Sequence, residues 1–164
     1  MRVLAGEGVA LEPQVAAHAS ELFALLTDAR LYTYLDDQPP LDEASLRARF
    51  VRLEARQSPD GTERWLNWVV RARVPLVGYV QATIFPDYTA SIGYVIGANH
   101  WRRGYGRAAV SAMLTELAEV YAVRHASATI DRQNEGSRQL LLSLGFAWEL
   151  ELESGEQRYG RELT

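Results

Sequence analysis

Two glycines and three arginines lie close together in the run Trp101-Arg102-Arg103-Gly104-Tyr105-Gly106-Arg107. The segment Ser91–Ile96 before it is rich in β-branched and aromatic residues and predicts a strand, whereas Ala108–Tyr121 after it has apolar residues at helical spacing. The first turn of a helix carries N–H groups without intrahelical partners and a partial positive charge. Because glycine has no Cβ, it lets an anion come close to such groups. The run therefore predicts a helix start that binds phosphate.

The known nucleotide motifs do not fit this run. A Rossmann fingerprint needs a third glycine where the chain has Ala109, and a P-loop needs a lysine, which the chain lacks altogether. A plain glycine-rich turn with solvated arginines is the alternative interpretation. Other parts of the chain have to decide between the two.

Composition narrows the class of protein. The 164 residues are 48% hydrophobic and 23% charged, which is typical of one globular domain, and we assign residues 1–164 to a single domain. No apolar run approaches the roughly 20 residues of a membrane span, and the N-terminus has no long apolar signal region. We therefore expect a cytoplasmic protein without membrane contact. A net charge of −4 argues against nucleic acid as a partner.

Missing residue types exclude several mechanisms. Without cysteine the chain forms no disulfide and no acyl-cysteine intermediate, and without lysine it forms no side-chain Schiff base. The histidines show no metal-ligand spacing, so we expect no metal site; they are His18, His100 and His125.

The remaining elements predict one α/β domain. The strand–helix–strand unit around the glycine-rich run favours a parallel strand pair, and the strands before it favour an antiparallel meander. Helices are expected over 15–27, from Asp42 onward and over 139–144. Strands are expected at 9–11, 65–71, 76–85, 125–130, 146–153 and 157–163. This gives a mixed, mostly antiparallel sheet of six to seven strands with flanking helices.

A second motif lies downstream of the first. Asn134-x-x-Ser137, an apolar helix and Leu144-Gly145-Phe146 resemble motif B of the GNAT family of acetyl-CoA-dependent N-acetyltransferases. The run from Trp101 resembles motif A, in the W-x-x-G-x-G/A form typical of the ribosomal-protein (RimJ/RimL-like) branch. The resemblance covers nearly the whole chain. It implies the GNAT fold, in which the two central strands splay apart and receive the pantetheine arm of acetyl-CoA.

The resemblance also implies the cofactor-binding residues. Backbone groups of Tyr94, Val95 and Ile96 would bond the pantetheine amides as an added strand does. Asn134 would hydrogen-bond the cofactor arm. The pyrophosphate would lie on the first turn of the helix, with residues Arg102, Arg103, Gly104, Tyr105, Gly106, Arg107 and Ala108.

The catalytic residues are less clearly marked. Ser137 matches the serine that is proposed to protonate the departing thiolate in the related branch, and Asn134 of the same motif is the second candidate catalytic residue. A solvent-facing serine and a plain helix N-cap are their alternative roles. The tyrosine that many members use as the acid is replaced by Leu141, and the glutamate that many use as the base is replaced by Ser91. Water can relay the proton, and the distant candidate bases are Asp36, Asp37 and Glu63.

The acceptor is only outlined by the sequence. In this family the variable segment with Tyr32, Tyr34, Asp36 and Asp37 frames the acceptor cleft, which would favour a cationic amine. Packing of these tyrosines in the core is the alternative. We expect direct transfer of acetyl from acetyl-CoA to a primary amine in a ternary complex, by a monomer or homodimer. The acceptor would be a protein N-terminus or a small-molecule amine. A non-catalytic acyl-CoA-binding module is the second hypothesis.

Overall fold

The computed structural model describes residues 1–163 and is built on one eight-stranded sheet. Its strands are β1 (Leu4–Gly6), β2 (Val9–Pro13), β3 (Arg64–Arg71), β4 (Leu76–Ile84), β5 (Thr89–Ile96), β6 (His125–Asp131), β7 (Ala147–Glu151) and β8 (Glu156–Glu162). Their order in the sheet is β1-β2-β3-β4-β5-β6-β8-β7, and only β5 and β6 pair in parallel. The sheet is mixed and mostly antiparallel, as predicted. It has one strand more than the largest number expected, and β1 lies in a segment for which we predicted no strand.

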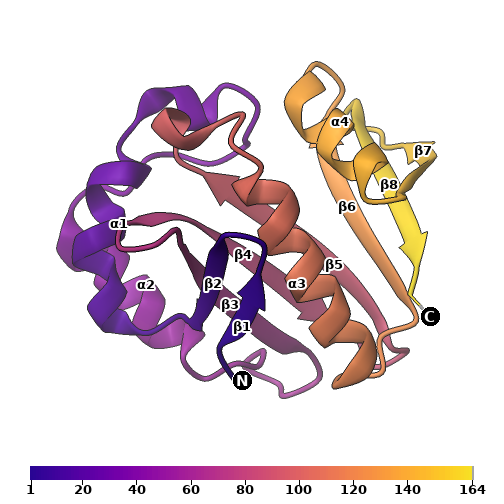
Figure 1. The fold of residues 1–164 in the computed structure, drawn as a ribbon. Coiled ribbons are helices and arrows are strands. Elements are labelled where there is room, and N and C mark those ends of the chain that lie inside the picture. Colours follow the sequence, from indigo (N-terminus) through magenta and orange to yellow (C-terminus); the bar gives the residue numbers. More distant parts are fainter. Residues whose placement is uncertain (164) are drawn as a thin grey trace.

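Four helices cover the two faces of the sheet. They are α1 (Ala19–Leu26), α2 (Glu43–Leu53), α3 (Tyr105–Glu119) and α4 (Glu135–Ser143). Strand side chains alternate between faces, and the core divides accordingly. On β4, Val80 packs with α3 in one apolar cluster, whereas Tyr79 packs against the cluster formed with α1 and α2. In Figure 1, α3 lies in front of the sheet and α4 lies beside β6 and β8.

Local sequence sets the helix boundaries. Asp42 caps α2 as predicted, since its side chain accepts a hydrogen bond from Ser45 N at 2.6 Å. The predicted helix over 15–27 is shorter, with α1 preceded by a 3₁₀ turn at Ala16–His18. The predicted helix over 139–144 begins earlier, at Glu135, because Asn134 caps it. The apolar spacing marked only the second half of α4.

The sheet opens between its two central strands. Pairing of β5 with β6 runs only from Thr89↔His125 to Ser91↔Ser127. On its other side β5 stays paired with β4 as far as Gly78↔Ile96. Residues 92–96 therefore have a free edge that faces a widening gap, and the two ribbons diverge in Figure 1. The splay expected from the sequence is present.

None of the helices within residues 1–163 has the length and apolar character needed to cross a membrane.

Candidate functional site

A cavity of about 470 Å³ occupies the gap between β5 and β6. It is lined by the end of β5, the loop into α3, the first turn of α3, the start of α4 and the segment 30–35. The cavity brings together every site residue predicted from the sequence except Ala108, namely Tyr94, Val95, Ile96, Arg102, Arg103, Gly104, Tyr105, Gly106, Arg107, Asn134 and Ser137. Two segments more than 25 residues apart thus meet at one opening.

The start of α3 presents free backbone N–H groups to this cavity. Gly104, with φ of 81°, is the N-cap, and no side chain of residues 1–163 caps the helix. Ala108 N donates to Gly104 O at 3.0 Å, so its amide is used inside the helix. The unpaired amides of the first turn are those of Tyr105, Gly106 and Arg107. The candidate anion-binding stretch therefore ends at Arg107, because Ala108 neither lines the cavity nor has a free N–H.

The two glycines of the run serve different purposes. A Cβ at Gly104 would meet no atom within 4 Å, but its φ is one that L-residues rarely adopt. A Cβ at Gly106 would lie 2.8 Å from Leu140 Cδ1 and 3.5 Å from Ile96 Cγ1. Gly104 is therefore needed for backbone conformation, and Gly106 for the close approach of α3 to α4 and β5.

The free edge of β5 exposes only part of the backbone that the sequence suggested. Gly97 N donates to Val77 O at 2.8 Å, and backbone groups alternate in direction along a strand. Those of Val95 therefore face β4, whereas those of Tyr94 and Ile96 face the gap. Trp101 Nε1 donates to Ile96 O at 2.6 Å, which leaves Tyr94 N–H, Tyr94 C=O and Ile96 N–H for a ligand.

The first turn of α4 closes the other side of the cavity. Asn134 Oδ1 accepts from Ser137 N at 3.1 Å, so Asn134 is an N-cap, and its carboxamide N–H groups are not used by that bond. Tyr94 Oη donates to Ser137 O at 3.4 Å, across the gap from β5 to α4. Burial raises the pKa of Tyr94 to about 12, so its phenol is neutral near pH 7. Sequence reasoning assigned Tyr94 a backbone role and missed this side-chain contact.

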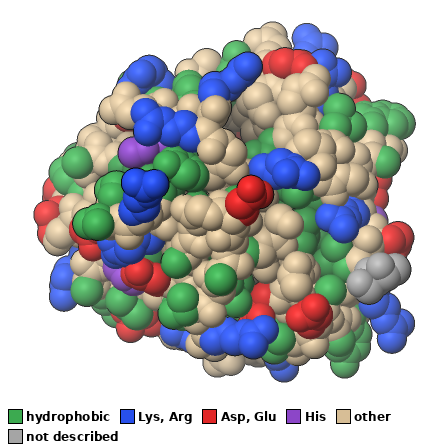
Figure 2. Space-filling model, in the orientation of Figure 1, with side chains coloured by type: hydrophobic (Ala, Val, Ile, Leu, Met, Phe, Trp, Pro, Cys, Tyr) green, Lys and Arg blue, Asp and Glu red, His purple; other side chains and the backbone are tan. Residues whose placement is uncertain are grey.

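The charge of the cavity is positive. Four arginines line it, and no Asp or Glu is among its lining residues within the described chain; the arginines are Arg30, Arg102, Arg103 and Arg107. Arg30 is ion-paired with Asp28 at 2.6 Å, so the positive charge comes mainly from the other three. Figure 2 shows basic side chains along the upper part of the face that carries α3. Positive charge at the free N-terminus of a helix suits a polyanionic ligand.

Neither of the two positions at which the sequence departs from the GNAT pattern lines this cavity. Leu141 is fully buried in the apolar core. Ser91 is exposed and is the last residue of β5 that pairs with β6, opposite Ser127. Neither side chain can move a proton in the way that a tyrosine or a glutamate would.

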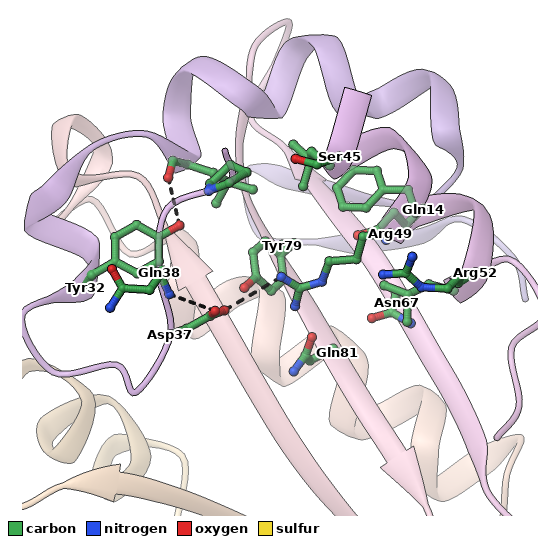
Figure 3. A pocket seen from close by; sticks show the side chains of 15 residues that line it. Gln14, Tyr32, Asp37, Gln38, Ser45, Arg49, Arg52, Asn67, Tyr79 and Gln81 are labelled. Carbon is green, nitrogen blue, oxygen red and sulfur yellow. Dashed lines mark hydrogen bonds and ion pairs between the residues drawn. The ribbon is translucent and has the colours of Figure 1, made fainter. Parts of the chain in front are cut away.

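A second cavity of about 180 Å³ lies on the opposite face of the sheet, under α2 (Figure 3). We call it the α2 pocket; its polar lining residues are Gln14, Tyr32, Asp37, Gln38, Ser45, Arg49, Arg52, Asn67, Tyr79 and Gln81. Asp37 Oδ2 lies 3.7 Å from Arg49 Nη1. Tyr32 Oη donates to Leu26 O at 2.7 Å.

The structure divides the residues that were predicted to frame the acceptor. Tyr32 and Asp37 line the α2 pocket, and Tyr34 lines the larger cavity. Asp36 lines neither cavity. Glu63 also lines neither, and it accepts a hydrogen bond from Trp65 Nε1 at 2.9 Å.

Several solved structures with the same architecture are acetyltransferases. One is RimL, a ribosomal-protein alpha-N-acetyltransferase in complex with coenzyme A, with a TM-score of 0.83, 17% identity and coverage of 98% of each chain. Mycobacterium smegmatis RimJ in complex with a CoA disulfide gives a TM-score of 0.79 at 19% identity, over 98% of this chain and 85% of that chain. The microcin C7 self-immunity acetyltransferase MccE, in complex with acetyl-CoA and AMP, gives 0.77 at 17% identity, over 95% and 93%. At these identities the likeness establishes the fold.

Sequence comparison establishes the family. No curated protein sequence matches the chain significantly. The profile of the acetyltransferase (GNAT) domain matches residues 9–147, which is most of the chain. The fold and the branch that the two motifs suggested agree with this match and with the RimL and RimJ structures. The chain belongs to the GNAT family of acetyltransferases.

Proposed function

We propose that the protein transfers an acetyl group from acetyl-CoA to a primary amine by direct attack, with both substrates bound together. The observation that carries this proposal is the cavity between β5 and β6, where the uncapped start of α3 and the free edge of β5 face the same space. RimL and MccE, which share the fold, are in complex with coenzyme A and acetyl-CoA respectively.

The residues of the cavity fit such a co-substrate along its length. The amides of Tyr105, Gly106 and Arg107 would hold the pyrophosphate, aided by Arg102 and Arg103. The free groups of Tyr94 and the N–H of Ile96 would hold the amides of the pantetheine arm. Asn134 has carboxamide N–H groups left to donate to the same arm.

In this arrangement the thioester would lie near the vertex of the gap, beside Ser91 and Ser127. The amine nitrogen attacks the carbonyl carbon, a C–N bond forms and the C–S bond breaks. The leaving thiolate takes a proton, for which Ser137 is the proposed donor at the start of α4. The amine loses its proton to water, because no carboxylate of the described chain lines the cavity.

Thiol release from acetyl-CoA with a panel of primary amines tests the proposal. Initial-rate plots against acetyl-CoA at several amine concentrations should intersect, since both substrates must be present before transfer. Parallel lines, or an acetylated enzyme isolated without amine, would contradict direct transfer.

The panel also separates the proposal from its alternative. Calorimetric binding of acetyl-CoA without turnover on any amine would instead favour a non-catalytic acyl-CoA-binding module. That hypothesis is supported only by the replacement of two family residues by Leu141 and Ser91.

A further inference from the structure

The α2 pocket holds one buried polar group without a hydrogen-bond partner in the described part of the chain. Gln14 is 6% exposed and Asn67 is 8% exposed. Within residues 1–163, Gln14 Nε2 is buried and has no hydrogen-bond partner. Buried polar groups are nearly always paired in folded proteins. The amide of Gln14 therefore points to a ligand group that completes the pocket.

The amides of the pocket form a row that leads toward the gap. Gln14 N donates to Asn67 O, Asn67 pairs with Gln81 across β3 and β4, and Gln81 pairs with Gly93 across β4 and β5. Gly93 lies just beyond Ser91, where β5 parts from β6. A Cβ at Gly93 would lie 3.1 Å from Gln81 Nε2, so the missing side chain leaves room for Gln81. The row thus runs across the sheet from the pocket to the place proposed for the thioester.

This geometry places the pocket on the side from which an acceptor approaches. The start of α3 and the first turn of α4 line the cavity of the proposed co-substrate, and the α2 pocket lies on the other face of the sheet. Neighbouring strands are about 4.8 Å apart. Arg49 lies beside Tyr79 on β4 in Figure 3. A group bound there is one to two strand spacings, roughly 5–10 Å, from the gap.

The charges of the pocket favour an anion. The pocket is lined by two guanidinium groups, of Arg49 and Arg52, and by one carboxylate, of Asp37. The ion pair of Arg49 with Asp37 is long, at 3.7 Å, and both side chains are about half exposed, at 47% and 53%. Such exposed pairs are weak and exchange readily. A planar guanidinium binds a carboxylate through two parallel hydrogen bonds. The charge balance is opposite to the cationic preference that the tyrosines and aspartates suggested in the sequence.

We propose that the α2 pocket selects an acceptor amine that carries a carboxylate, and that Arg49 binds this carboxylate in place of Asp37. The inference rests on the proposed acetyl transfer and deepens it by naming the class of acceptor. A glutamate side chain, in the free amino acid or near a peptide N-terminus, has a suitable length. The amides of Gln14, Asn67 and Gln81 then hydrogen-bond the polar atoms between the carboxylate and the amine.

Two matched pairs of acceptors test the inference, with thiol release from acetyl-CoA as the readout. They are L-glutamate against L-glutamine, and the peptide amides Ser-Glu-Ala against Ser-Gln-Ala. In at least one pair kcat/KM should favour the carboxylate by about tenfold or more. The variant Arg49→Gln should lose this preference while keeping its KM for acetyl-CoA. The control Arg47→Gln, on the same helix and outside the pocket, should keep the preference.

The outcomes separate the two levels of the proposal. Absence of the preference in both pairs, or a preference that persists in Arg49→Gln, would overturn the inference while acetyl transfer stands. No thiol release with any amine would instead remove the proposed function on which the inference depends. A preference in the pair of free amino acids alone would identify a small-molecule acceptor, and one in the peptide pair alone an acidic peptide end.

Discussion

The two cavities lie on opposite faces of the same sheet, and one is built mainly from backbone groups and the other from side chains. The cavity at the gap depends on backbone groups of β5 and of the first turn of α3. The α2 pocket depends on side chains from β3, β4, α2 and two connecting segments. A backbone-built site needs glycines at fixed spacing and leaves a contiguous signature in the sequence. A side-chain-built pocket leaves none, and a single substitution can change its selectivity.

Each cavity nevertheless contains a half-buried tyrosine with a raised pKa. Burial raises the pKa of Tyr94 to about 12 in the cavity at the gap, and it raises the pKa of Tyr79 to about 12 in the α2 pocket. Tyr94 Oη donates to Ser137 O, whereas Tyr79 lies next to Arg49. Tyr94 thus links β5 to α4 at one cavity, whereas Tyr79 lines the charged pocket at the other.

The largest expected effect concerns the one hydroxyl assigned chemistry in the backbone-built cavity. Ser137→Ala should lower kcat by about 10²–10⁴-fold with little change in the KM for acetyl-CoA, because a proton donor acts in the transition state. Thiol-release kinetics measure both constants. Ser143→Ala, in the last turn of the same helix, is the matched control. Wild-type turnover in Ser137→Ala would show that water is the acid.

A smaller but substantial effect is expected at the helix start. Gly104→Val forces a β-branched residue into a φ of 81° and should weaken CoA binding by at least about tenfold. Gly104→Asn, which tolerates that conformation better, should bind CoA more tightly than the valine variant. Calorimetry with CoA compares them, with circular dichroism as the check on folding. Equal wild-type affinity in both variants would refute the backbone-built site.

Asn134 allows the structural and cofactor-binding roles to be separated. Asn134→Ala removes the cap on Ser137 N and should lower the free energy of unfolding by about 1 kcal/mol. Asn134→Asp keeps a capping oxygen and should restore that stability. If the carboxamide N–H groups bind the cofactor arm, both variants should still show a raised KM for acetyl-CoA. A normal KM in the aspartate variant would leave Asn134 with the capping role alone.

The smallest expected effect compares the two half-buried tyrosines, Tyr79 and Tyr94. Both pKa values lie above the ordinary value of about 10, so the folded state holds these protons more tightly than the unfolded state. The stability that they contribute is complete below about pH 10 and is lost as the pH rises to about 12. Urea unfolding between pH 8 and pH 11.5, roughly across this window, should show a shallower alkaline loss in Tyr79→Phe and in Tyr94→Phe. The exposed Tyr88→Phe should follow the wild type.

The sequence was sufficient for the family, the parallel strand pair and the helix start, because each depends on residues that are neighbours in the chain. Trp101 and Tyr94 show the limit of prediction from sequence neighbours. Their hydrogen bonds to Ile96 O and Ser137 O depend on how the loop and α4 fold back onto β5. From the sequence, Gly104 and Gly106 shared one predicted role, the close approach of an anion. In the structure Gly104 adopts a left-handed backbone conformation, and Gly106 leaves room for packing of α3.

The α2 pocket was the least predictable part. Gln14, Asn67 and Gln81 are ordinary strand-end and strand residues in the sequence, and only the register of β3 with β4 aligns them. Asp37 was noted for its negative charge, but its partner Arg49 lies on α2, outside the segment that was predicted to frame the acceptor. The charge balance of the pocket therefore depends on the fold, which brings Asp37 and the arginines of α2 to the same face of the sheet.

The short pairing of β5 with β6 has a mechanical consequence. Three residue pairs make up the backbone ladder between the first five strands and the leaf formed by β6, α4, β7 and β8. A ligand that forms hydrogen bonds with the free edge of β5 and also contacts α4 would connect this leaf to the rest of the domain. CoA at a free concentration of about 100 times its Kd would add about 2.7 kcal/mol to the free energy of unfolding. Amide exchange in β6 and α4 should therefore slow when CoA is added.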